Sequence, residues 1–354
     1  MSRFFSNKYS SLEAYTPGEQ PKDMKYIKLN TNESPFPPSQ GAIELAFEEA
    51  KRLQLYSDPE CTPLVSKCAE LYGVKKSQIL FTNGSDEILN FAFMAFCDKD
   101  NPIVFPDITY GFYTVFADLN GIPYEQIPLK DDFSVDYRDY VAIGKNIVIA
   151  NPNAPTGIAL PLWQIEEIVK TNPQNVVIID EAYVDFGAES AVSLVDKYDN
   201  LIVTQTFSKS RSLAGARLGV GIACEALIAD MNTIKYSTNP YNINRMTMSA
   251  GYGVLCDEEY TKKNCRTIIE NRTFTENELK KLGFEFSPSM TNFVFVKHPL
   301  IDGEKLYLSL KERDILVRHF KDARICDYNR ITIGTREQME KLICAVKDIL
   351  EENK

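Results

Sequence analysis

One lysine in this sequence has neighbours that suit it to covalent chemistry. Lys209 lies between Ser208 and Ser210 in a segment of small residues, and Arg217 follows eight residues later. A lysine that is desolvated beside other cations becomes an uncharged nucleophile, which Schiff-base chemistry with a carbonyl group requires. A solvated loop lysine is the ordinary alternative for such a residue taken alone.

An acidic residue follows one of the most apolar runs of the chain. Asp180 comes directly after residues 176–179, and Glu181 and Tyr183 follow it. A carboxylate at the end of a buried strand is costly unless it has a cationic or proton-donating partner. Asp180 is therefore expected to face such a partner, while a helix cap would explain the same residue.

Two further segments place polar groups where strands are expected to end. Gly84 and Ser85 open a predicted helix, where free backbone N–H groups and the helix dipole favour an anion. A plain helix N-cap would account for them as well. Residues 151–157, Asn-Pro-Asn-Ala-Pro-Thr-Gly, predict a rigid turn that presents amide side chains, and turn chemistry explains this segment equally well.

Together, the four segments supply the groups that a pyridoxal phosphate site needs. Asp180 would keep a ring nitrogen protonated, Lys209 would form a Schiff base, and serine, glycine and arginine donors would bind a phosphate. Ligands of doubly wound folds bind beyond the carboxyl ends of the strands. The four segments are therefore expected to meet at one edge of a sheet.

Short apolar runs predict the strands that position these segments. They lie at residues 79–81, 103–105, 147–150, 176–179, 202–204 and 218–222. Nearly uninterrupted apolar character is typical of strands that are covered on both faces. Spacings of roughly 25–30 residues leave room for crossover helices. We therefore expect residues 45–250 to form a large cofactor-binding domain around a mostly parallel, doubly wound sheet.

The rest of the chain predicts a smaller α+β domain, built from an N-terminal arm at residues 1–44 and from residues 251–354. Strands are expected at 293–296 and 331–333. The final helix is well marked, because Thr335 and Gln338 form a possible capping box and apolar residues then repeat at helical spacing. The expected fold class is α/β with this second, smaller domain.

Composition and charge restrict the class of function. The 49 acidic and 39 basic residues give a net charge of -10, which disfavours binding to nucleic acid or to an anionic membrane surface. No run of about 18 apolar residues predicts a membrane span, and the first residues lack the apolar stretch of a signal peptide. Eight scattered cysteines without a C-x-x-C pair suit a reducing cytoplasm. The two histidines lie in no metal-binding pattern, so no metal is expected.

With these motifs in place, the sequence resembles the aspartate-aminotransferase-like, fold type I pyridoxal-phosphate enzymes. Asp180-Glu181-Ala182-Tyr183 and the segment from Ser208 to Arg217 carry the likeness to this superfamily. Within it, the N-terminal segments 15–21 and 29–35 and the C-terminal segment 330–335 resemble the histidinol-phosphate aminotransferases. The resemblance extends over nearly the whole chain.

Position by position, the resemblance implies roles for single residues. Lys209 would form the Schiff base, Asp180 would pair with the ring nitrogen, and Tyr183 would bond the phenolic oxygen of the cofactor. Tyr110 would stack on the ring. The family usually has Asn directly before Pro-Thr-Gly, bonding the phenolic oxygen, but this chain has Ala154 there. Either Asn153 replaces that contact or Tyr183 acts alone.

The resemblance also assigns the phosphate and substrate groups. The residues that match the phosphate cup are Gly84, Ser85, Thr206, Ser208 and Arg217. Tyr56 matches a tyrosine that reaches the phosphate of the neighbouring subunit, which implies a homodimer. Arg330 matches the arginine for the substrate carboxylate, and Tyr15 and Arg318 match groups near a substrate phosphate.

The implied activity is a pyridoxal-5'-phosphate-dependent transamination. Histidinol phosphate and 2-oxoglutarate would give imidazole acetol phosphate and glutamate, and the reverse direction would serve histidine synthesis. An aminotransferase of aromatic or other amino acids, or an enzyme like threonine-phosphate decarboxylase, would use the same cofactor groups. A non-catalytic regulatory module would also bind the cofactor, but such modules carry a DNA-binding domain, and no helix-turn-helix pattern precedes the sheet.

Overall fold

The computed structural model describes residues 2–10, 12, 18–21 and 25–353, and its larger sheet has seven strands. Their spatial order is β2-β8-β7-β6-β5-β3-β4, and all neighbouring pairs are parallel except those that involve β8. The strands are β2 (Ile79–Thr82), β3 (Ile103–Pro106), β4 (Tyr124–Ile127), β5 (Asn146–Ala150), β6 (Val177–Asp180), β7 (Leu201–Thr206) and β8 (Gly219–Ala223). The mostly parallel sheet that the sequence predicts is thereby confirmed.

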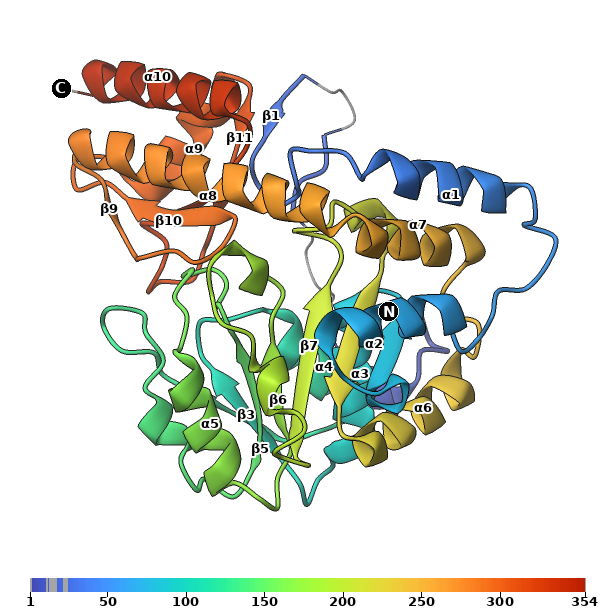
Figure 1. Ribbon diagram of the computed structural model, residues 1–354. Coiled ribbons are helices and arrows are strands. Elements are labelled where there is room, and N and C mark those ends of the chain that lie inside the picture. Colours follow the sequence, from blue (N-terminus) through green and yellow to red (C-terminus); the bar gives the residue numbers. More distant parts are fainter. Residues whose placement is uncertain (1, 11, 13–17, 22–24, 354) are drawn as a thin grey trace.

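Helices cover both faces of this sheet (Figure 1). Because side chains alternate along a strand, Ile147 and Ile149 pack with residues of α5 on one face, while Val148 packs with residues of α3 and α6 on the other. The helices of this part are α1 (Gln40–Ala50), α2 (Thr62–Tyr72), α3 (Ser85–Phe96), α4 (Phe112–Asn120), α5 (Leu162–Thr171), α6 (Glu225–Thr238) and α7 (Arg245–Cys256). The sheet is therefore doubly wound.

A smaller antiparallel sheet has the order β12-β13-β10-β9 and its own apolar core. Its strands are β9 (Glu285–Phe286), β10 (Phe293–Lys297), β12 (Arg318–His319) and β13 (Asn329–Thr332), and β1 (Ile27–Lys28) pairs separately with β11 (Ile315–Leu316). The helices beside it are α8 (Glu258–Lys281), α9 (Gly303–Glu312) and α10 (Arg336–Glu352). This α+β part agrees with the expected fold, and the exact domain bounds stay a prediction.

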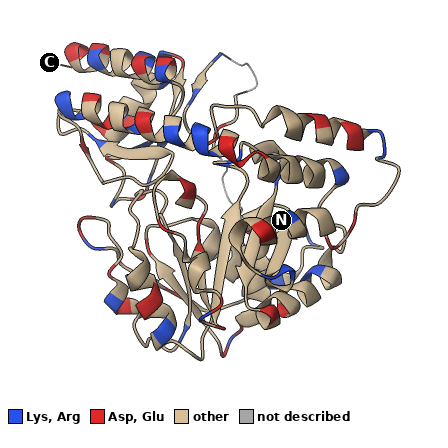
Figure 2. Cartoon of the chain, viewed as in Figure 1, with Lys and Arg blue, Asp and Glu red and all other residues tan. Residues whose placement is uncertain are grey.

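The helices around the smaller sheet follow local sequence signals. The capping box of Thr335 and Gln338 is formed at the start of α10, as predicted. Acidic and basic side chains are interspersed along α8 and α10 (Figure 2), which suits faces in contact with water. Within the described ranges, no helix is both long and apolar enough to cross a membrane.

Candidate active site

A pocket of about 540 Å³ lies beyond the carboxyl ends of β6 and β7. Both sheets contribute to it, because β12 and β13 supply arginines while β6 and β7 supply the acid and the lysine segment. The predicted site residues that line it are Ser85, Tyr110, Asp180, Tyr183, Thr206, Ser208, Lys209, Arg217, Arg318 and Arg330. The structure thus brings together residues that are distant in sequence.

Lys209 lies in the turn after β7. Its Nζ atom donates a hydrogen bond to the backbone oxygen of Thr31 at 3.2 Å. The same atom lies 5.8 Å from the ring centre of Tyr183. A primary amine is therefore held at the wall of the pocket, near the ring of Tyr183.

The two oxygens of the Asp180 carboxylate have different surroundings. Oδ2 accepts a hydrogen bond of 2.9 Å from the hydroxyl of Tyr113, which is fully buried. Oδ1 is buried and has no hydrogen-bond partner in the described part of the chain. Burial raises the pKa of this carboxyl to about 6, and the hydrogen bond from Tyr113 opposes that effect. One buried acceptor is thus left for a donor within the pocket.

Small residues and an arginine form a cradle at the N-terminus of α3. Gly84 has a φ of 84°, and a Cβ atom there would lie 2.6 Å from Nη2 of Arg217. Nη2 also donates to Oδ2 of Asp86 at 2.9 Å, and Nη1 lies at 3.5 Å from Oγ of Ser208. The hydroxyl of Thr206 donates to the same Oγ at 3.0 Å. Backbone N–H groups, hydroxyls and a guanidinium therefore converge where an anion binds favourably.

Two arginines face the pocket from the smaller sheet. Arg318 of β12 and Arg330 of β13 are directly paired in the antiparallel register. Nη2 of Arg330 donates to the backbone oxygen of Asn30 at 3.0 Å. Two guanidinium groups in one pocket with the lysine suit a small molecule that carries anionic groups.

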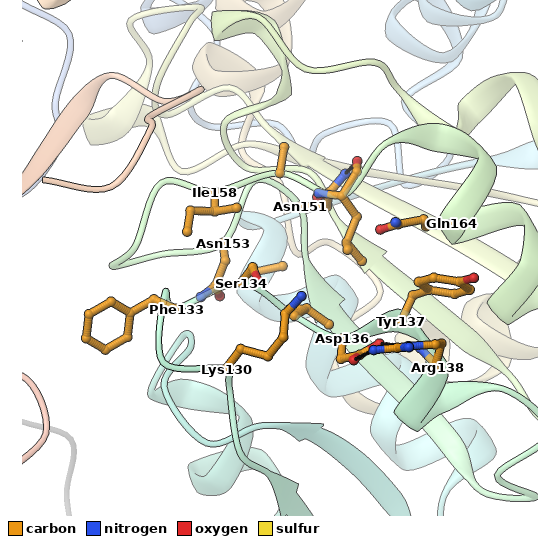
Figure 3. A pocket seen from close by; sticks show the side chains of 14 residues that line it. Lys130, Phe133, Ser134, Asp136, Tyr137, Arg138, Asn151, Asn153, Ile158 and Gln164 are labelled. Carbon is orange, nitrogen blue, oxygen red and sulfur yellow. Dashed lines mark hydrogen bonds and ion pairs between the residues drawn. The ribbon is translucent and has the colours of Figure 1, made fainter.

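Asn153 is not brought to this pocket. Its Nδ2 donates to the backbone oxygen of Ile108 at 2.9 Å and to Oγ1 of Thr156 at 3.1 Å, and its Oδ1 accepts from Oγ1 of Thr109 at 2.7 Å. It lines a separate cavity of about 390 Å³ together with Lys130 and Phe133 (Figure 3). Ala154 lines the main pocket and has no side-chain donor.

For two other predicted residues, the described pocket gives no support. Tyr56 is 80% exposed and stacks on Tyr241 with the ring centres 4.7 Å apart. Tyr15 lies outside the described residues. Their expected roles toward a partner subunit and a substrate phosphate stay predictions.

Three side chains at the site were missed by reasoning from the sequence. Tyr113 holds Asp180, Asp86 accepts hydrogen bonds from Arg217 and from the Tyr110 hydroxyl at 2.7 Å, and Asn32 donates to the Tyr183 hydroxyl at 2.9 Å. Tyr113 follows Tyr110 by three residues, and its backbone N–H donates to the backbone oxygen of Tyr110 in the turn that begins α4.

A family described as aminotransferase class I and II matches residues 24–346 of the chain. The chain belongs to this family. A curated relative, the histidinol-phosphate aminotransferase of Brachyspira hyodysenteriae, is 51% identical over 356 residues and covers 99% of this chain and 100% of its own. As a member of the family, the chain is a pyridoxal-phosphate-dependent aminotransferase.

Two solved structures share the fold of this aminotransferase. The histidinol-phosphate aminotransferase of Sinorhizobium meliloti, in complex with pyridoxal-5'-phosphate, has a TM-score of 0.90 at 23% identity and 99% coverage of both chains. The aspartate aminotransferase of Thermotoga maritima has a TM-score of 0.79 at 22% identity and 92% coverage of both chains. The aspartate-aminotransferase-like fold is thereby confirmed.

The pocket of this aminotransferase fits pyridoxal phosphate. The buried Oδ1 atom of Asp180 accepts no hydrogen bond from the described chain, which suits a protonated ring nitrogen. The cradle at Gly84 and Arg217 suits a phosphate because a larger residue at position 84 would fill it. Lys209, whose Nζ atom is a primary amine, lines the same pocket.

Proposed function

We propose that this aminotransferase acts on histidinol phosphate and 2-oxoglutarate, giving imidazole acetol phosphate and glutamate. The observation that carries the proposal is the pair of arginines, Arg318 and Arg330, in one pocket with Lys209. Each proposed substrate carries anionic groups, a phosphate in histidinol phosphate and two carboxylates in 2-oxoglutarate, and guanidinium groups suit both kinds of group. The 51% identity to the Brachyspira enzyme supports the same substrate.

Each residue role is part of the proposal. When bound, pyridoxal phosphate supplies an electron sink that acidifies the α C–H bond of an amino substrate. The cradle of Gly84, Ser85, Thr206, Ser208 and Arg217 binds its phosphate, and Tyr110 lies against its ring. Asp180, fixed by Tyr113, holds the proton on the ring nitrogen. Asn153 holds the turn of residues 151–157, since its amide is bonded within that turn and to Ile108.

Lys209 is proposed to move the proton. Its Nζ atom would hold the cofactor until a substrate amine takes its place. The amine of Lys209 would then take the proton from the substrate α-carbon as a general base and give a proton to the C4′ carbon of the cofactor as a general acid. Arg330 orients 2-oxoglutarate and glutamate through the α-carboxylate, and Arg318, with Tyr15, binds the phosphate group of histidinol phosphate.

We also propose that the enzyme is a homodimer in the cytoplasm. Large apolar side chains are exposed on α1 and the segment after it, and they are Ile43 at 45%, Phe47 at 64%, Leu53 at 58%, Leu55 at 57% and Tyr56 at 80%. Soluble proteins rarely leave a large contiguous apolar patch in water, and such patches mark interfaces. We propose that a second copy of the chain packs against these exposed apolar side chains.

The test is a rapid-mixing survey of amino donors by the change in cofactor absorbance. Histidinol phosphate is expected to react fastest, ahead of histidinol, glutamate and phenylalanine. Arg318→Gln should reduce kcat/KM for histidinol phosphate by about 10-fold or more, since a charge-assisted contact is lost, and should change the reaction of phenylalanine little. Fastest reaction of phenylalanine, or release of CO₂ without glutamate formation, would contradict the proposed substrate.

A further inference from the structure

Asn32 is a buried polar residue of the pocket lining that the sequence did not single out. It is 1% exposed, and its backbone adopts the left-handed region with a φ of 56°. Nδ2 donates to the hydroxyl of Tyr183 at 2.9 Å, and Oδ1 accepts from Oγ1 of Thr332 at 3.0 Å. The backbone oxygen of Asn32 accepts from Nδ2 of Asn292 at 3.0 Å. Both ends of the amide are therefore fixed.

The network around Thr332 determines which end of the amide faces Tyr183. The backbone N–H of Asn32 donates to Oγ1 of Thr332 at 3.0 Å, so the hydroxyl hydrogen of Thr332 remains for Oδ1 of Asn32. The amide nitrogen is then the atom that faces Tyr183. A tyrosine hydroxyl has one hydrogen, and because it accepts from Asn32 it keeps that hydrogen for another partner.

The pocket lining indicates which group receives the hydroxyl hydrogen of Tyr183. Tyr183 lines the pocket, and its ring lies 5.8 Å from Nζ of Lys209. Neither of the two residues before Pro155 offers a competing side-chain donor there. Ala154 has none, and the amide of Asn153 donates to Ile108 and Thr156. Contacts to the phenolic oxygen therefore depend on Tyr183.

We propose that Asn32 is a positioning residue, which orients the Tyr183 hydroxyl so that it donates its hydrogen to the phenolic oxygen of bound pyridoxal phosphate. The inference rests on the proposed function of Tyr183. Thr332 lies two residues after Arg330 on β13, so the same strand that carries a substrate arginine also fixes the donor at the cofactor. Asn32 also lines the pocket, and we expect a substitution there to act on the cofactor through Tyr183.

This orientation has a consequence for protonation at Lys209. A hydrogen bond donated to the phenolic oxygen stabilises its negative charge. A proton on the nitrogen that joins Lys209 to the cofactor is then stabilised less by this oxygen. That nitrogen therefore loses its proton at a lower pH when Tyr183 donates. Loss of the donated hydrogen raises the pKa of the linkage.

The experiment is a pH titration of the visible absorbance of the holoenzyme. Tyr183→Phe is expected to raise the midpoint by about 1 pH unit, and Asn32→Gly by about 0.5 to 1 unit in the same direction. In the double variant, Asn32→Gly should add no further shift to Tyr183→Phe, because the two residues act as one unit. Equilibrium dialysis of the cofactor supplies a second readout.

The variants are chosen to separate positioning from folding. Glycine at position 32 adopts the left-handed backbone without strain, so the change removes the side chain alone. Asn32→Asp keeps the shape but accepts the hydrogen of Tyr183, and it should also raise the midpoint. Asn329→Ala is the matched control, since Asn329 is a fully buried amide on the same strand that donates to Gly303 at 2.9 Å. It should reduce thermal stability and leave the midpoint unchanged.

Every outcome decides between distinct conclusions. A shift in Tyr183→Phe without a shift in Asn32→Gly and Asn32→Asp would overturn the positioning role and leave the proposed function intact. An unchanged midpoint in Tyr183→Phe would overturn both the role of Tyr183 and the inference that depends on it. An additional shift in the double variant would show that Asn32 acts by another route.

Discussion

At the scale of single residues, the candidate site contains a buried carboxylate oxygen without a hydrogen-bond partner in the described chain. Asp180 has one oxygen bonded to Tyr113 and one without a partner in the described chain. A buried acceptor of this kind is costly unless a ligand supplies the donor. The carboxylate in the cofactor-free protein is therefore suited to accept a hydrogen bond from a protonated ring nitrogen.

Lys209 is expected to be the lysine that carries the cofactor. Reduction of the holoenzyme with borohydride followed by peptide mapping should place the label on Lys209, because among the described lysines its amine is the one that lines the pocket with Tyr183 and Asp180. Lys209→Ala should abolish transamination and retain some cofactor through the cradle. Labelling of a different lysine would contradict the site.

Replacing Asp180 with Asn should separate catalysis from stability. We expect kcat to fall by about 100-fold or more, because a neutral amide cannot hold the ring proton. The folded pKa of about 6 lies above the ordinary value of 3.8, so the native state keeps a proton that the unfolded chain has released. The free energy of unfolding of the cofactor-free wild type therefore falls as pH rises from about 4 to about 6.

The asparagine variant lacks this loss of stability. Above pH 6, cofactor-free Asp180→Asn should unfold at the same temperature as the wild type or at a higher one. Thermal unfolding of the cofactor-free proteins at several pH values measures the expected difference in stability. Steady-state kinetics of the holoenzymes measure the expected fall in kcat. A near-native kcat in Asp180→Asn would contradict the catalytic role and leave Asp180 with only a structural role.

At the scale of elements, the sequence predicted what continuous apolar runs can reveal. The buried strands β2, β3, β5, β6, β7 and β8 were found to within two residues at each end. The strand β4 was missed, because it lies at the edge of the sheet and its side chains Tyr124, Glu125 and Gln126 are exposed. An exposed edge strand has no apolar run to detect.

The site was predicted as far as its groups lie directly after strands. Lys209, Asp180 and Ser85 were predicted in this way and line the pocket, while their roles stay predictions. The contact of Asn32 with Tyr183 was not predicted, because the two residues are 151 positions apart and no local pattern connects them. The orientation of Asn153 away from the pocket depends on Ile108 and Thr156, which are contacts that only the folded turn creates.

The close approach of β8 to α3 gives a test at this scale. A Cβ atom on Gly219 would lie 2.3 Å from the backbone nitrogen of Ser85, so Gly219→Ala must displace the start of α3. Overpacking costs about 1–3 kcal/mol, and cofactor affinity should fall by roughly 5- to 150-fold. Fluorescence titration of the cofactor measures the loss.

Gly221→Ala is the matched control in the same strand. Its Cβ atom would meet the Ile88 side chain at 3.0 Å, which is the flexible end of a side chain and not backbone. The cofactor affinity of this variant should change little. Equal losses in both variants would show that the effect is general destabilisation of β8.

At the scale of the whole molecule, the pocket depends on contact between the two sheets. The larger sheet supplies Lys209 and Asp180, whereas the smaller sheet supplies Arg318 and Arg330. Asn32 joins them, because it is bonded to Thr332 of β13 and to Tyr183 after β6. A change in the relative position of the sheets therefore alters substrate and cofactor contacts together.

The proposed dimer extends this dependence to a second chain. Tyr56 should donate a hydrogen bond to the cofactor phosphate of the partner subunit. Loss of one hydrogen bond to a charged group costs about 1.5–3 kcal/mol, so Tyr56→Phe should weaken cofactor affinity by roughly 10- to 150-fold. Tyr124→Phe, another exposed tyrosine on the edge strand β4, is the control and should have no effect.

Hybrid dimers of Tyr56→Phe and Lys209→Ala subunits decide whether Tyr56 acts across the interface. In the hybrid, the one site with a lysine lies in the Tyr56→Phe subunit. If Tyr56 acts on the partner, this site receives an intact Tyr56 from the other chain and recovers wild-type affinity. If Tyr56 acts within its own chain, the same site keeps the weakened affinity of Tyr56→Phe. Weak affinity at that site, or a monomer in sedimentation at assay concentrations, would exclude a shared active site.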